Sequence, residues 1–300
     1  MSSKWIIILI LTLITGIILF NIAYITYMKG NEIKLRISTT TSLYATGLLD
    51  KLAEEFSKKH PNIIVQFIAV GSGAALRKAE LGDADLVLVH APSLEKKYLE
   101  KEVIYGGRIF AYNYFVIVGP KDDPARIKGL DPVSAMKKIY EAGEKGLAKF
   151  ISRGDNSGTH VRELMLWSIA GLNSKGKPWY IETGSGMSET LMVANEYSAY
   201  TISDIGTYLK FSNKLSELTV LVDEGDILIN IYSAYLVKNS SNEKYAEMFM
   251  DFLISKEGQE IIGNYGVNDF GRPLFYSVES ADINKLLSLW NKFSEGNDGS

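Results

Sequence analysis

Residues 63–89 read IIVQFIAVGSGAALRKAELGDADLVLV and contain a complete strand–helix–strand unit. The first eight residues are almost all apolar and rich in Ile and Val, a composition that predicts a buried strand. Residues 71–73 (GSG) then open a helix that runs through Leu81, and residues 85–89 (DLVLV) predict a second buried strand. Units of this kind assemble around a mostly parallel sheet. This stretch therefore predicts an α/β fold.

The same alternation continues on both sides of this unit. Upstream, a strand at 34–38 (KLRIS) precedes the polar residues 39–42 (TTTS) and a helix whose apolar positions recur from Leu48 to Phe56. Downstream, the pattern predicts helices at 93–101, at 131–142, after Ser157 and after Gly186, strands at 150–151 and 227–237, and a mainly helical remainder at 242–293.

Two apolar segments predict how the chain is divided. Residues 112–118 (YNYFVIV) end in the polar break GPKDDP, and the second segment is the strand at 227–237. If both segments cross between two lobes, the first lobe consists of residues 34–119 and 226–295, and residues 120–225 form an inserted second lobe. We therefore expect two α/β lobes with a cleft between them.

Composition excludes several classes of function. The chain has 300 residues, of which 46% are hydrophobic and 22% charged, and it has no Cys. Cysteine-ligated zinc, iron–sulfur clusters, thiol catalysis and lipoprotein anchoring are therefore excluded. The formal net charge of −3 leaves no basic field for nucleic acid, so we expect no nucleic-acid partner.

Residues 1–30 differ from the rest of the chain. From Trp5 to Met28, 24 consecutive residues carry no charge, and Lys4 precedes them. A helix of this length reaches roughly 36 Å, enough to cross a hydrocarbon core of ~30 Å. The segment is predicted to be a signal peptide or an uncleaved transmembrane signal-anchor, and its length and lack of an A-x-A site favour the anchor. We therefore expect the remaining chain to be extracytoplasmic, either membrane-tethered or secreted.

Four polar loops each lie at or just before a predicted helix start. They are residues 39–42 (TTTS), 71–73 (GSG), 152–160 (SRGDNSGTH) and 184–189 (GSGMSE). A helix start offers unpaired N–H groups and a partial positive charge, and Ser and Thr hydroxyls add donors. Any one loop is explained by ordinary capping. Four loops, two in each predicted lobe, favour a single shared anion.

Arg153 is the only Lys or Arg within these loops. Its planar guanidinium suits bidentate binding of an oxyanion, and the alternative is a surface ion pair with Asp155. The chain has no G-x-S-x-G or Walker motif, and its three histidines stand far apart. Ser157 with His160 is the remaining candidate nucleophile and base. We therefore expect neither an enzyme nor a cationic metal site.

The motifs closely resemble the tungstate-binding proteins of tungstate ABC transporters. The resemblance extends over roughly 34–275 and rests on TTTS, VGSGAAL (70–76), ADLVLVHAP (84–92), FVIVGP (115–120), SRGDNSGTH, GSGMSETL (184–191) and AYTISDIGTYL (199–209). It implies a type II periplasmic-binding-protein fold and, as partners, an ABC permease with its ATPase. It implies tungstate or molybdate as the ligand and no cofactor, and we expect a monomer.

The same resemblance implies a set of ligand-binding residues. The first lobe would contribute Thr40, Thr41, Ser42 and Ser72, and the second lobe Arg153, Ser157, Gly158 and Thr159.

His90 lies where similar phosphate receptors carry an aspartate, which accepts the proton of phosphate. A histidine there, as a neutral donor or a cation, would not repel a deprotonated dianion. The alternative is that His90 only packs behind the strand. A phosphate or sulfate receptor and, less favoured, an exported serine hydrolase remain the competing functions.

Overall fold

The predicted strand–helix–strand unit forms as β2 (Ile63–Val70), α4 (Ser72–Glu80) and β3 (Leu86–Val89). The structure is a computed structural model that describes residues 3–30 and 32–295. Strand β1 (Ile33–Thr40) lies between β2 and β3 and is parallel to both. The α/β fold predicted from residues 63–89 is confirmed.

The rest of the large sheet is antiparallel. Its path is β10–β4–β9–β3–β1–β2, in which β9 (Ile229–Val237) runs against both β3 and β4 (Ile104–Pro120). The prediction of a mostly parallel sheet is therefore wrong beyond β1–β3. The reason is that β4 and β9 are long strands that pass between the lobes in opposite directions.

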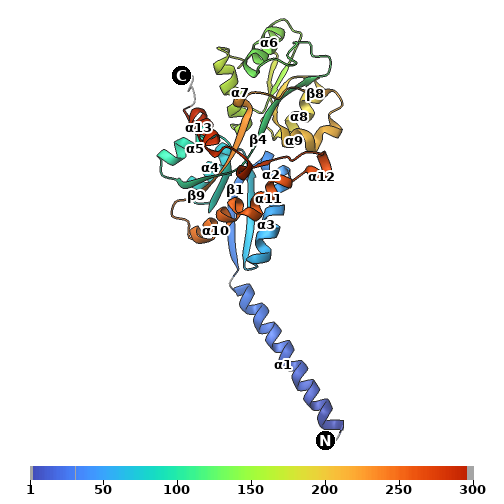
Figure 1. The fold of residues 1–300 in the computed structure, drawn as a ribbon, viewed down its shortest axis with the longest axis vertical. Helices are drawn as coiled ribbons and strands as arrows, with labels where there is room; N and C mark the ends of the chain where they lie inside the picture. The colour runs from blue at the N-terminus through green and yellow to red at the C-terminus, as the bar shows by residue number, and fades with distance from the viewer. Residues whose placement is uncertain (1–2, 31, 296–300) are drawn as a thin grey trace.

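Strand β4 changes partners in its middle. Its first part pairs with β9 as far as Tyr114, opposite Ile229. From Phe115 onward it pairs with β7 (Thr201–Asp204) and β8 (Leu218–Val222). This switch gives the two-lobed form seen in Figure 1, where α6, α8 and β8 gather at one end and α3, α10 and α11 at the other. The division at residues 119/120 and 225/226 stays a prediction.

Each lobe has its own hydrophobic core. In the first lobe, one core packs against α3 and α10 and includes Phe56, Phe110 and Phe249, and a second lies under α4 and α5. In the second lobe, Phe150 and Trp167 belong to the core beneath α6 and α7.

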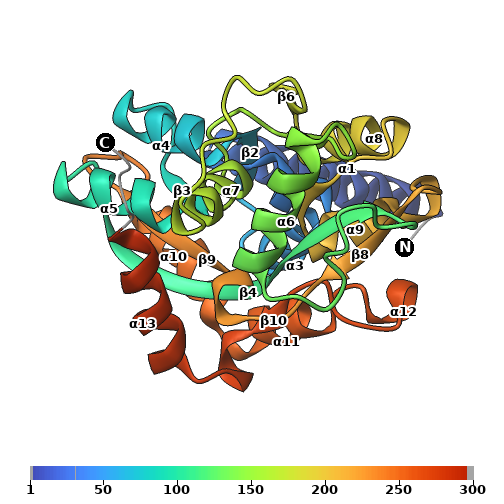
Figure 2. The same cartoon turned by 90° about the horizontal axis from the view of Figure 1, so that it is seen from above.

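Between and after these strands lie the helices α2 (Thr41–Ala45), α3 (Leu48–Lys59), α5 (Pro92–Glu100), α6 (Pro132–Glu144), α7 (Gly158–Ile169), α8 (Met187–Glu196), α9 (Ile205–Phe211), α10 (Glu243–Ile254), α11 (Lys256–Asn264), α12 (Val267–Phe270) and α13 (Ile283–Ser294). The short strands β5 (Phe150–Ser152), β6 (Tyr180–Glu182) and β10 (Tyr276–Ser277) complete the fold, with one-turn 3-10 helices at Ser212–Lys214, Asp226–Leu228 and Val278–Ser280. Helix α13 lies beside α5 (Figure 2), where Trp290 Nε1 donates to Glu95 Oε2 at 2.7 Å.

Two local features differ from the pattern. The helix after residues 39–42 is broken into α2 and α3, because Gly47 adopts a left-handed conformation with φ 86°. Strands β6, β7 and β8 have only three to five residues each, too short for hydrophobic periodicity to distinguish them from loops.

The N-terminal segment forms α1 (Ser3–Gly30), which projects away from the rest of the chain (Figure 1). The helix is confirmed, but over the residues whose side chains are described no helix is long and apolar enough to cross a membrane. The predicted transmembrane segment is therefore not supported.

Candidate functional site

The first polar loop lies where β1 ends and α2 begins. Thr40 caps α2, because its Oγ1 accepts a hydrogen bond from the Leu43 N–H at 3.3 Å. The same oxygen is 3.4 Å from Ser42 Oγ, and both side chains are buried. Because α2 has only five residues, its contribution comes from hydroxyl groups more than from a helix dipole.

The second and third loops bring two helix starts into contact. Ser72 is the first residue of α4, and Ser157 caps α7 by accepting from the His160 N–H at 3.3 Å. The Gly73 N–H donates to Asn156 O at 3.4 Å. A Cβ on Gly71 would lie 3.7 Å from Ser157 Cα, an ordinary van der Waals distance, so the two turns lie against each other.

Arg153 joins the third loop to the first. Its side chain is 2% exposed, and its Nη2 donates to Asp155 Oδ2 at 2.6 Å and to Thr41 Oγ1 at 3.2 Å. Asp155 Oδ1 also accepts from the Ser157 N–H at 3.1 Å. The ion pair between Arg153 and Asp155, which the sequence offered as an alternative, therefore forms. Arg153 is buried between the lobes and does not lie on the surface.

Several buried donors in these loops have no hydrogen-bond partner among the described residues. They are Thr39 Oγ1, Ser72 Oγ, Thr159 Oγ1 and the Nε and Nη1 of Arg153. An unsatisfied buried polar group costs roughly 1–3 kcal/mol. A tetrahedral oxyanion presents only acceptors, so the chemistry of this donor set fits such a ligand.

Behind the first loop, His90 begins a directed chain of hydrogen bonds. Its Nδ1 bonds Asn230 Oδ1 at 2.8 Å, Asn230 Nδ2 donates to Asn113 Oδ1 at 2.9 Å, and Asn113 Nδ2 donates to Leu274 O at 3.3 Å. The Leu274 carbonyl can only accept, so it sets the direction of the whole chain. The proton of His90 is therefore on Nδ1, and Nε2, 3.4 Å from Ser42 Oγ, is an acceptor.

This arrangement corrects the expected role of His90. Burial lowers the pKa of the imidazole to about 3, opposed by the bond to Asn230 and reinforced by Arg153 and Arg162. The ring is thus neutral and is neither a cation nor a donor toward Ser42. The absence of a carboxylate at this position is unaffected, and the ring also stacks on Tyr232 at 4.8 Å between centroids.

The fourth loop meets the first. A Cβ on Gly186 would lie 3.8 Å from Thr41 Oγ1. Together with Ser42, Glu189 and Thr207, these residues line a cavity of about 440 Å³. All four polar loops therefore come together between the lobes.

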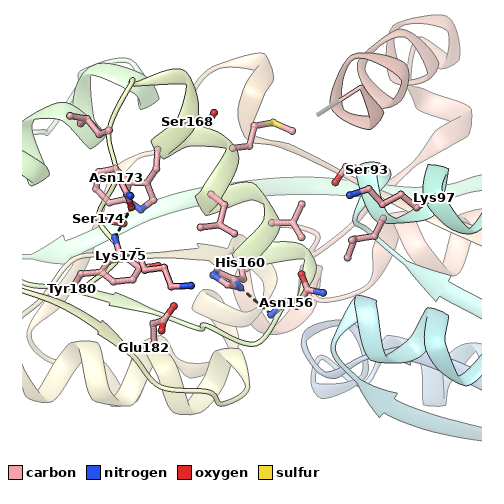
Figure 3. Close-up of a pocket in the computed structure, with 16 residues that line it drawn as sticks. Ser93, Lys97, Asn156, His160, Ser168, Asn173, Ser174, Lys175, Tyr180 and Glu182 are labelled. Atoms are coloured by element: carbon pink, nitrogen blue, oxygen red, sulfur yellow. Dashed lines mark hydrogen bonds between the residues drawn. The ribbon is translucent and has the colours of Figure 1, made fainter. Parts of the chain in front are cut away.

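A larger cavity of about 640 Å³ runs along α7, beside the third loop (Figure 3). Ser93 and Lys97 of α5 line one side, and His160 and Asn156 the other. His160 Nδ1 accepts from the Asn156 N–H at 3.0 Å, and Ser157 Oγ is occupied as the helix cap. This geometry gives the serine-hydrolase hypothesis no nucleophile–base contact.

The described residues include no group of three or more metal-ligating side chains. Sequence reasoning missed Asn113, Asn230 and the buried Arg162. The asparagines could have been noticed as polar residues inside the apolar strands YNYF and INIY, whereas Arg162 had no comparable signal.

Comparison with known proteins also indicates a binding protein. Residues 29–257 match the family model of the PBP superfamily domain. The tungstate-binding protein TupA of Peptoclostridium acidaminophilum is 39% identical over 257 residues, which cover 83% of this chain and 86% of that protein. The tungstate-binding protein TupA of Campylobacter jejuni is 33% identical over 237 residues, covering 77% of this chain and 86% of that protein.

A solved structure gives the same result at the level of the fold. The tungstate ABC transporter structure from Geobacter sulfurreducens is 42% identical, with a TM-score of 0.68, and the match covers 77% of this chain and 98% of that chain. The resemblance drawn from the motifs is confirmed.

Proposed function

The chain belongs to the PBP superfamily and to the family of its tungstate-binding relatives, and on that premise we propose that it is a receptor for a tetrahedral oxyanion, tungstate or molybdate. The relatives are tungstate-binding proteins and the similar solved structure is that of a tungstate ABC transporter, so we propose a binding protein and not an enzyme. The receptor would deliver its ligand to an ABC permease with its ATPase.

One observation carries this proposal. Buried donors in loops of both lobes have no hydrogen-bond partner among the described residues, and they include the Nε and Nη1 of Arg153. In our proposal, Thr40, Thr41, Ser42 and Ser72 bind the anion from one lobe, with Ser72 Oγ as one of the donors. From the other lobe, Arg153, Ser157, Gly158 and Thr159 bind it through the guanidinium, the hydroxyls and the start of α7.

In our proposal, selectivity against phosphate comes from the lack of a carboxylate at position 90. Near neutral pH phosphate carries a proton, and a selective phosphate site needs an acceptor for it. Of the two carboxylates within these loops, Asp155 is engaged by Arg153 at 2.6 Å and by the Ser157 N–H, and the solvent-exposed Glu189 accepts from Ser188 Oγ at 2.9 Å. Position 90 offers a neutral ring in place of a carboxylate, so no negative charge there repels a fully deprotonated dianion.

The proposal places the binding domain outside the cytoplasm, exported by the apolar run at residues 5–28. Whether it is secreted or tethered is decided by N-terminal sequencing of the protein recovered from outside the cytoplasm. A tethered protein would retain residues 1–30, and a secreted one would begin near residue 31.

The function is tested by calorimetric titration of residues 31–300 with tungstate, molybdate, sulfate and phosphate at pH 7. We expect tungstate to bind at least roughly three decades more tightly than phosphate, a difference of about 4 kcal/mol. Comparable phosphate binding would replace this proposal by a phosphate receptor, and preferred sulfate binding by a sulfate receptor.

A further inference from the structure

Arg162 is a buried arginine on α7 that does not belong to the polar loops. Its side chain is 4% exposed. The guanidinium donates from Nη1 to Ile227 O at 2.7 Å and from Nη2 to Ile229 O at 3.3 Å. Its Cζ lies 3.7 Å from the ring centre of Phe293 and 5.5 Å from that of Phe115. The cation is therefore enclosed by backbone carbonyls and aromatic faces.

No carboxylate pairs with Arg162 among the described side chains, whereas Arg153 is paired with Asp155. A buried charge without a counter-charge costs free energy. Burial accordingly lowers the pKa of Arg162 to about 9, with no acid opposing it. A group with a pKa near 9 remains charged at neutral pH. Arg162 is thus a cation whose counter-charge is not supplied by the protein around it.

Two buried acids of the same lobe, Glu163 and Asp204, form no ion pair with Arg162. Glu163 accepts hydrogen bonds from Ser152, Trp167 and Tyr180, and burial raises its pKa to about 7. Burial also raises the pKa of Asp204. In both cases burial favours the uncharged carboxyl.

The electrostatic field of Arg162 extends to the polar loops, because Arg162 and His90 both lie beside the Phe115 ring. The His90 ring lies 6.0 Å from the Phe115 ring, on which Arg162 also lies. After burial, repulsion from Arg153 and Arg162 helps to hold the pKa of His90 down. Since His90 is 3.4 Å from Ser42 Oγ, the positive potential extends to the proposed anion site.

We propose that Arg162 is a specificity-determining residue that favours a dianion over a monoanion of the same shape, acting through its field and without contact. The formal charges of Arg153 and Asp155 cancel each other. The positive charge of Arg162 therefore has no counter-charge until an anion binds. This inference rests on the proposed function.

The test compares two tetrahedral oxyanions of similar size, tungstate (charge −2) and perrhenate (charge −1). Arg162→Gln removes the charge and keeps a donor, and Arg162→Lys keeps the charge. Arg126→Gln is the matched control, because Arg126 is solvent-exposed in the same lobe and its loss changes the net charge equally. Both anions are titrated calorimetrically against each variant, and thermal unfolding without ligand shows whether each variant folds.

The Coulomb energy between Arg162 and the ligand is proportional to the ligand charge. The fold-change in the dissociation constant of the dianion is therefore the square of the fold-change for the monoanion. We expect Arg162→Gln to weaken tungstate about 10- to 100-fold and perrhenate only about 3- to 10-fold. Arg162→Lys and Arg126→Gln should stay within about threefold of the parent for tungstate. If Arg162→Gln does not fold, Arg162→Met takes its place with the same expectations.

Equal losses for tungstate and perrhenate, or equal losses in the Lys and Gln variants, would overturn the inference and leave Arg162 a structural residue. The parent titration separates this from the proposed function. If the parent binds tungstate, only the role of Arg162 is in question, and if it does not, the proposed function itself fails.

Discussion

Gly158 and His90 touch across the two lobes. A Cβ on Gly158 would lie 2.6 Å from His90 Cε1 and 2.7 Å from the His90 backbone oxygen. Side chains can shift, but a backbone oxygen at this distance cannot move without moving the strand. Only a glycine therefore lets the start of α7 close against the end of β3.

This contact predicts the effect of Gly158→Ala. The added methyl group should hold the lobes apart, at a cost of about 1–3 kcal/mol, or roughly 5- to 150-fold in tungstate affinity. Calorimetry measures the loss, and thermal unfolding without ligand should change little if the lobes can separate. Gly263→Ala is the control, because the nearest atom to its Cβ would be 3.4 Å away. Unchanged tungstate affinity in Gly158→Ala would show that closure does not need this contact.

Arg153→Ala should lower tungstate affinity strongly. The loss of a hydrogen-bonded charge partner in a buried site costs roughly 2–5 kcal/mol, or about 30- to several-thousand-fold in affinity. Arg153→Lys should recover only part of this, because an ammonium lacks the planar fork. Binding of tungstate by Arg153→Ala within a factor of three of the parent would mean that the site is misplaced.

His90→Asp should weaken the binding of tungstate more than the binding of phosphate. The new carboxylate would lie near Ser42 and Gly158, where it repels a dianion but can accept the proton of phosphate. His90→Asn is the matched control, since it has the same shape without the charge. The measurement is competition between the two anions at pH 7. A tungstate-to-phosphate ratio that is the same in the Asp and Asn variants would contradict the prediction.

Glu163→Gln should change how stability depends on pH. The folded-state pKa of Glu163 is about 7, against 4.5 for an ordinary glutamate, chiefly because of burial. Between these values the folded state holds a proton that the unfolded state has lost, so the free energy of unfolding contributed by Glu163 falls as pH rises from 4.5 to 7. The fall is about 3 kcal/mol in total. Above pH 7 this contribution is constant.

Urea unfolding of parent and variant at pH 5 and pH 8, without ligand, measures this difference. Glu163→Gln should gain stability relative to the parent between the two pH values. The comparison cancels the opposite trend of His90, whose depressed pKa makes stability increase from pH 3 to 6.5. Glu196→Gln removes a carboxyl at an exposed position and is the control variant. If Glu163→Gln gives the same change between pH 5 and pH 8 as this control, the raised pKa of Glu163 is contradicted.

The local sequence pattern determined much of the secondary structure of this protein and the position of its polar loops. Hydrophobic runs such as 63–70 and helix signals such as Ser157 depend on neighbouring residues, so they predicted the α/β alternation and the polar loops at helix starts. The motif order also led to the family. The role of each candidate site residue toward an anion stays a prediction.

Tertiary structure decided what depends on residues far apart in the chain. The antiparallel course of β4 and β9 arises because the chain crosses twice between lobes, which no local window records. The proton position on His90 is set by a hydrogen-bond chain that ends at Leu274. The burial of Arg162 against Phe293 joins residues 131 positions apart. A sequence states which charges exist, but burial and partners, which fix their energies, come only from the packed chain.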